Sequence, residues 1–143
     1  MLDNSFPHLV MKLPKSPKAI SKLLLRVAFG GAIALVGLVH YMELSEFSSM
    51  VSAGLGPLTP LGNLWAYVLP ALMIIGGVLM VMDKRHDIAA WCAGGALASI
   101  AVGMLLKPVL GDATLGDVMP AVNNAFIWLI VYVLTVKWSM CNE

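Results

Sequence analysis

The sequence predicts an all-α protein: an integral membrane four-helix bundle with a short amphipathic interfacial helix between the first and second helices. Of its 143 residues, 59% are hydrophobic and 12% are charged, whereas a soluble domain is about half apolar and about a quarter charged. Four apolar stretches, at residues 20–42, 61–82, 88–106 and 120–136, can each cross a hydrocarbon core of about 30 Å, the last only just. No stretch alternates with the period of a membrane β-strand, so helices must satisfy the backbone in lipid.

The first stretch follows a tail, residues 1–19, that is rich in proline and lysine. Ser16 and Pro17 suit the start of a helix, because proline is tolerated in the first turn. The apolar stretch is too long for a cleaved signal peptide, so we expect a retained anchor. Arg26 lies about one and a half turns inside this helix, and we expect its side chain to reach lipid headgroups rather than form a buried ion pair.

Residues 43–60 are too polar to span a membrane, yet apolar side chains recur there at helical spacing, at Leu44, Phe47, Met50 and Val51. This pattern predicts a short amphipathic helix at the membrane interface. Glycine and proline then break the helix before the second stretch, at Gly54, Gly56, Pro57 and Pro60.

The remaining stretches carry their own boundary signals. Pro70 predicts a kink in the second helix, which we attribute to packing rather than to a cavity. Residues 83–87 form a polar hairpin, and Lys107 with Pro108 is expected to end the third helix. Asp117 or Pro120 is expected to open the fourth helix, which leaves residues 138–143 as a second tail.

The basic residues predict the orientation. Only Lys107 falls on one side of the four-span arrangement, and eight fall on the other: Lys12, Lys15, Lys18, Lys22, Arg26, Lys84, Arg85 and Lys137. Because cytoplasmic loops are enriched in lysine and arginine, both tails and the 83–87 hairpin are expected in the cytoplasm. The predicted location is the cell membrane, plasma or bacterial inner, with an acidic outer face formed by Glu43, Glu46, Asp112 and Asp117.

Small residues recur at helical spacing and predict where helices approach closely. The expected packing positions are Gly30, Gly37, Gly76, Gly77, Ala90, Gly94, Gly95, Ala98, Ser99 and Gly103. We expect most of these faces to be used within the bundle, with a homo-oligomer contact as the alternative. The expected partners are the lipid bilayer and other membrane subunits or a second copy, and no nucleic acid.

The best candidate site is the outer end of the first helix, where His40 and Glu43 share a face with Phe47, and Tyr41 and Glu46 lie nearby. A histidine beside a carboxylate can exchange protons with a quinone headgroup. Asn123 and Asn124 are candidates to bond a ligand carbonyl or another helix. The plain alternative is a polar helix end among lipid headgroups.

Other chemistry finds little support in the sequence. A di-metal site needs a second His and Glu pair, so no metal is predicted. Only His40 lies in a span, so no intrachain bis-histidine haem is expected. Cys92 and Cys141 form no CxxC motif and are interpreted as ordinary thiols.

From Arg26 to about Leu110, the order of features resembles the DoxX-like family of small four-helix membrane proteins. The residues that carry the resemblance are Leu25, Arg26, Gly30, Gly37 to His40, Phe47, Gly54 to Leu58, Trp65, Gly76, Gly77, Lys84, Arg85, Ala89 and Ala90. The resemblance implies the four-helix fold and a membrane subunit linked to quinone reduction or thiol redox balance, with quinone as a possible cofactor.

Two positions depart from the family pattern. His40 stands where a lysine is expected, and Met73 stands where an acid usually precedes the double glycine. Because that acid is a plausible proton carrier, the resemblance supports the fold better than the redox activity. The first hypothesis is therefore a quinone-linked membrane subunit that binds a small lipophilic ligand. The alternative is a non-catalytic structural or assembly subunit of a membrane complex, and a small-solute carrier comes third.

Overall fold

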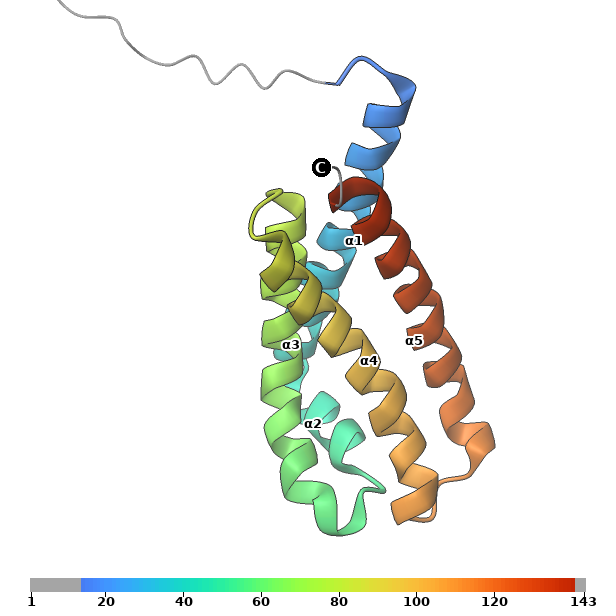
Figure 1. The fold of residues 1–143 in the computed structure, drawn as a ribbon. Helices are drawn as coiled ribbons and strands as arrows, with labels where there is room; N and C mark the ends of the chain where they lie inside the picture. Colours follow the sequence, from blue (N-terminus) through green and yellow to red (C-terminus); the bar gives the residue numbers. More distant parts are fainter. Residues whose placement is uncertain (1–13, 141–143) are drawn as a thin grey trace, which may run out of the picture.

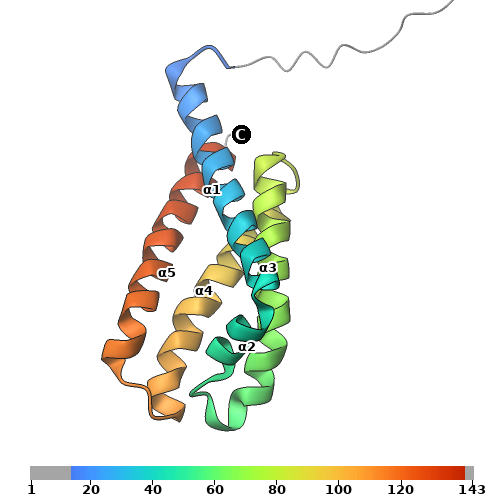
Figure 2. The ribbon, with the colours of Figure 1, turned by 180° about the vertical axis from the view of Figure 1, so that it is seen from behind.

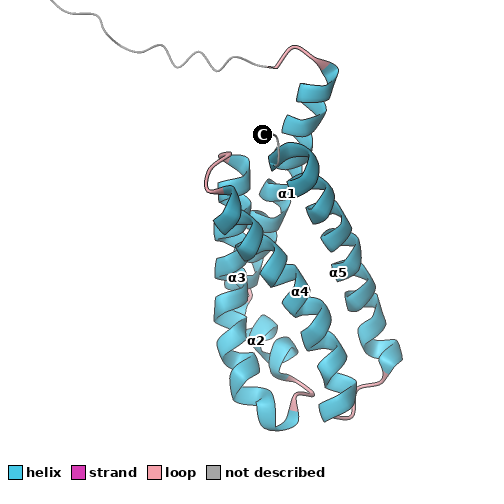
Figure 3. Cartoon of the chain, viewed as in Figure 1, coloured by secondary structure: helices cyan, strands magenta, loops and turns pink. Residues whose placement is uncertain are grey.

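The computed structural model describes residues 14–140, which are helical almost throughout and contain no strand (Figures 1 and 3). The elements are α1 (Pro17–Met42), α2 (Leu44–Ser52), the 3-10 turn η1 (Gly56–Leu58), α3 (Thr59–Val81), α4 (His86–Leu110), α5 (Leu115–Thr135) and the π-helical turn η2 (Val136–Met140). The all-α prediction is confirmed. The four segments long and apolar enough to cross a membrane are Pro17–Met42, Gly56–Val81, His86–Leu110 and Leu115–Met140.

Helix α3 is the centre of the arrangement. It packs against α1 most extensively and against α4 on another side, and α5 packs on α4. Helices α1 and α5 share few contacts (Figures 1 and 2). Both described ends of the chain lie at the same end of the bundle as the α3–α4 turn, and α2 lies at the other end with the α4–α5 loop.

Two predicted helix boundaries are wrong. Helix α4 does not stop at Lys107 and Pro108 but continues to Leu110, because a proline so near the end removes a single backbone bond. Helix α5 begins at Leu115, ahead of both predicted starts. Thr114 accepts a bond from the Asp117 amide, and the Asp117 carboxylate accepts one from the Thr114 amide at 3.0 Å, which forms a capping box.

Helices α1 and α3 cross so closely that the crossing needs glycine. A Cβ atom on Gly30 would lie 2.7 Å from the carbonyl oxygen of Gly77, and a Cβ on Gly77 would overlap the Gly30 carbonyl. One and a half to two turns further along, a Cβ on Gly37 would lie 2.8 Å from the Pro70 carbonyl. Helix α1 therefore lies directly over the backbone around Pro70, as the packing interpretation of this proline expects.

The small residues of α4 form two rows, Ala90–Gly94–Ala98 and Gly95–Ser99–Gly103, and the two rows have different surroundings. Gly94 faces α5, where a Cβ would lie 2.7 Å from the ring of Tyr132, and the Tyr132 hydroxyl donates to the Ala90 carbonyl at 3.0 Å. A Cβ on Gly95 or Gly103 meets no atom within 4 Å, so close packing within the chain does not hold at these two positions. Neighbouring residues on a helix point about 100° apart, so Gly94 and Gly95 cannot both face α5.

Arg26 does not behave as the sequence suggests. Its guanidinium forms an ion pair with the carboxylate of Asp83 at 2.5 Å, and the Arg26 side chain is only 14% exposed. Asp83 also pairs with the imidazole of His86 at 2.8 Å. The expectation that Arg26 extends to headgroups is wrong, because the packing of α1 on α3 brings this arginine to the α3–α4 turn.

The glycine crossing provides a test of the fold. Gly77→Ala should lower the thermal unfolding temperature in detergent, because the new methyl group pushes the α1 backbone away at a cost of about 1–3 kcal/mol. Gly31→Ala is the matched control on α1, since a Cβ there meets nothing within 4 Å. The control should be neutral or slightly stabilising, because alanine favours helix. Equal unfolding temperatures for the two variants would contradict the crossing.

Candidate functional site

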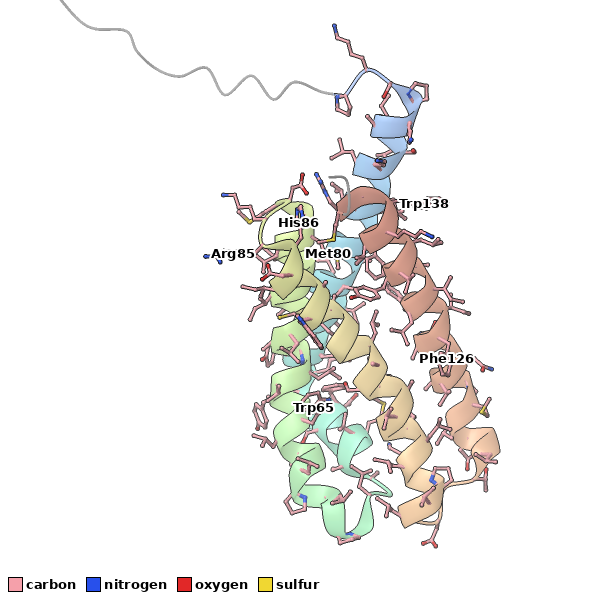
Figure 4. All side chains as sticks on the ribbon, in the orientation of Figure 1. Trp65, Met80, Arg85, His86, Phe126 and Trp138 are labelled. Atoms are coloured by element: carbon pink, nitrogen blue, oxygen red, sulfur yellow. The ribbon has the colours of Figure 1, made fainter. Side chains whose placement is uncertain are left out.

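A cavity of about 380 Å³ lies between α2, α3 and α4, at the end of the bundle away from the described termini. Its walls are almost wholly apolar. The lining residues that carry polar groups are His40, Lys107, Ser99 and Trp65, of which Figure 4 labels Trp65. A concave apolar space with a few polar groups is the usual form of a small-molecule site.

His40 lies in the last turn of α1 and is half-buried. Its ring stacks on the ring of Phe47, with centroids 4.0 Å apart and an angle of 7° between the planes. The sequence placed His40, Glu43 and Phe47 on one face of a helix, but the helix breaks at Glu43 (φ −112°, ψ 38°). The stacking therefore arises because the chain turns at Glu43 and α2 packs beside α3, and Glu43 is left exposed outside the cavity.

Phe47 anchors α2 to the bundle. Its side chain is 6% exposed and belongs to the core that α3 and α4 form. The rest of α2 is more exposed, so the Phe47 ring and a hydrogen bond from Lys107 to the Met50 carbonyl hold the short helix beside the cavity. The helix between α1 and α3 exists as predicted, and its place at a membrane interface stays a prediction.

Lys107 comes from the last turn of α4 and is one of the residues that line the cavity. Only 8% of the residue is exposed, and its ammonium donates to the backbone carbonyl of Met50 on α2 at 2.5 Å. Gly54, with φ +77°, passes over the aliphatic stem of Lys107, and this left-handed conformation favours glycine. The sequence analysis did not place Lys107 in the site, although its position as the lone basic residue of the outer half was a usable signal.

Another hydrogen bond at the cavity wall joins α3 to α4. The indole nitrogen of Trp65 donates to the hydroxyl of Ser99 at 3.0 Å, and Ser99 donates to the Ala96 carbonyl at 2.7 Å. Ser99 was predicted as a small packing residue, and it also acts as the acceptor that orients Trp65. The buried indole N–H is thereby satisfied, as such groups require.

The other predicted site residues lie away from this cavity. The Tyr41 hydroxyl donates to the Tyr67 carbonyl at 2.7 Å and joins α1 to α3. Glu46 is exposed on α2, and Asn123 is exposed on α5. Asn124 lines a second cavity of about 240 Å³ together with His40, so these two predicted residues face the same space.

The second cavity adjoins the first. It shares His40, Ile100 and Ala121 with the first cavity. A third cavity of about 270 Å³ lies between α1 and α5 and shares Trp128 with the second. Apolar space therefore follows the side of the bundle where α1 and α5 have few contacts.

Metal binding has no geometric support among residues 14–140, since no three His, Cys, Asp or Glu side chains there converge. Cys92 is a free, half-buried thiol on α4, and Cys141 lies outside the described residues. No family model, curated protein or solved structure matches the chain. The likeness to the DoxX-like family thus rests on the residues given above.

The anchoring role of Phe47 can be measured by hydrogen exchange. Phe47→Ala removes the ring that holds α2 and supports His40, so backbone amides of residues 44–52 should exchange at least about tenfold faster. Met50→Ala is the control, because that side chain is 53% exposed. Unchanged exchange in the Phe47 variant would show that other contacts hold α2.

Proposed function

We propose that the chain is a multi-pass protein of the cell membrane, with both ends and the α3–α4 turn in the cytoplasm and α2 at the outer surface. Four helices of sufficient length and apolarity support the four spans. The distribution of lysine and arginine supports the orientation, because only Lys107 lies at the α2 end. The grouping of both described chain ends with the α3–α4 turn agrees with an even number of spans.

Topology reporters test this arrangement. Reporters at residues 1, 85 and 143 should be accessible only from the cytoplasm, and reporters at residues 50 and 114 only from outside, because the positive charges resist translocation. A C-terminus outside the cell would contradict the four spans.

We further propose that the protein is a DoxX-like membrane subunit of a quinone-linked redox assembly and binds a small lipophilic ligand in the cavity beneath α2. The observation that carries this proposal is an apolar cavity of about 380 Å³ whose lining residues include His40 and Lys107. A quinone needs apolar walls for its ring and tail, and donors for its oxygens. Histidine supplies a group that can take up and release protons near neutral pH.

The contacts around His40 suit this role. Stacking on Phe47 fixes the plane of the imidazole, so one edge is available to a ligand at the junction of the first two cavities. A fixed catalytic group loses less entropy when it meets its substrate. The carboxylate of Glu43 is exposed, so His40 and not Glu43 would carry the proton transfer.

The alternative is a non-catalytic structural or assembly subunit. One observation favours it: Trp91, Gly95, Ala98 and Val102 form an exposed strip on α4 that no other described helix covers. The small residues of this strip, Gly95 and Ala98, would let another transmembrane helix approach closely. A small-solute carrier is less well supported, because the apolar cavity offers a polar solute few partners.

A matched pair of glycines on α4 separates the two functions. Gly103→Leu should fill part of the cavity, since Gly103 lines it and a Cβ there meets nothing within 4 Å, and should weaken binding of decylubiquinone about tenfold or more. Gly95→Leu makes the same change on the exposed strip and should leave quinone binding unchanged. Binding is measured on the purified protein in mild detergent, together with recovery of any companion subunit.

The outcomes are distinct. Loss of quinone in the Gly103 variant, with His40→Ala blocking turnover in the folded protein, supports the redox subunit. Loss of a companion subunit in the Gly95 variant, with normal quinone binding in the Gly103 variant, supports the assembly subunit and contradicts the redox proposal.

A further inference from the structure

We infer that Lys107 binds the polar end of the ligand, an electron-rich oxygen that belongs to a carboxylate or to a quinone carbonyl. The ligand's elongated apolar body would then follow the cavities from Lys107 towards Trp128. This inference rests on the proposed function, because it takes the cavity beneath α2 as the ligand site. It adds the residue that selects the headgroup and the chemistry that the headgroup must have.

The hydrogen bonding of Lys107 is incomplete for a buried ammonium. The group has three N–H donors. The Met50 carbonyl accepts one of them, and the residue is 8% exposed. Within residues 14–140, the pairs of opposite charge join Asp83 to Arg26 and to His86, at the other end of the bundle, so no carboxylate of this range neutralises Lys107.

A structural role alone accounts for only part of this arrangement. Holding α2 requires one donor and no charge, and a glutamine would provide that donor. Burying an ammonium without an opposite charge is costly, and the cost falls when an oxygen with negative charge or a strong dipole binds it. Lys107 is one of the residues that line the cavity, so a ligand oxygen inside the cavity would approach the ammonium from there.

The shape of the space defines the rest of the ligand. From Lys107 the first cavity reaches His40, the second continues from His40 to Trp128, and the third opens between α1 and α5. The walls of the three cavities are mostly apolar, with Asn124 and His40 as polar residues of the second. An elongated hydrocarbon or isoprenoid body therefore fits better than a compact polar solute.

The two headgroup chemistries would use His40 differently. A quinone has carbonyl oxygens on opposite sides of its ring, so one can accept from Lys107 while the other faces His40. A carboxylate has a single polar end and would need Lys107 alone. The effect of His40→Ala on binding therefore distinguishes a quinone ligand from a carboxylate ligand.

The experiment uses the full chain in mild detergent, with palmitate and decylubiquinone as probes and native mass spectrometry as the readout. Lys107→Met, which removes the donors and the charge, should weaken binding of at least one probe about tenfold or more. Lys107→Gln keeps a donor for the Met50 carbonyl, so it should fold normally and still bind palmitate less well if the charge is needed. Lys137→Met, at an exposed lysine near the other end, is the matched control and should change nothing.

Each outcome has one meaning. Weaker palmitate binding in both Lys107 variants, with no effect of His40→Ala, identifies a carboxylate ligand, and the unsubstituted protein should then prefer palmitate to its methyl ester. Weaker decylubiquinone binding in Lys107→Met and in His40→Ala identifies a quinone. If both probes bind the Lys107 variants normally and Gly103→Leu still removes binding, the inference is overturned and the proposed function survives. If neither probe binds the unsubstituted protein, the proposed function fails as well.

Discussion

The close crossing of α1 and α3 is the contact on which the other features of the structure depend. Gly30 and Gly77 have no room for a Cβ atom, so the two helix backbones touch along the most extensive interface of the bundle. In lipid, such contacts stabilise helix pairs through dispersion and weak hydrogen bonds, because apolar surface alone gives little preference between a lipid and a helix. The crossing determines which groups meet at each end of α1.

At one end the crossing brings Arg26 to the α3–α4 turn, where its ion pair with Asp83 joins three elements. At the other end of α1, the helix breaks at Glu43, and α2 packs beside α3 with Phe47 stacked on His40. Because α1 is committed to α3, it makes few contacts with α5, and apolar cavities occupy the space between them. The close packing of α1 on α3 thus leaves an apolar cavity between α1 and α5.

The cavity between α2, α3 and α4 is the place where the proposed ligand would bind. Its walls are almost wholly apolar, and its lining residues include the nearly buried Lys107 and His40, whose ring stacks on Phe47. A polar group in such a setting loses hydration and regains the free energy only through a partner. The Met50 carbonyl is one such partner for Lys107, and the proposed ligand would supply a further acceptor oxygen.

Sequence by itself determined the local features: four apolar helices, the short helix after His40, and a polar α3–α4 turn. These follow from hydropathy and from the need to satisfy each backbone group within its own segment. The capping box of Thr114 and Asp117 is also visible in the sequence, although the prediction places the start of α5 at Asp117 or Pro120. Tertiary structure alone decided that Gly94 packs while Gly95 does not, that Arg26 meets Asp83, and that Lys107 bonds α2. A membrane helix is apolar on nearly every face, so its pattern does not reveal its rotation or its neighbours, and contacts between residues far apart in the chain depend on both.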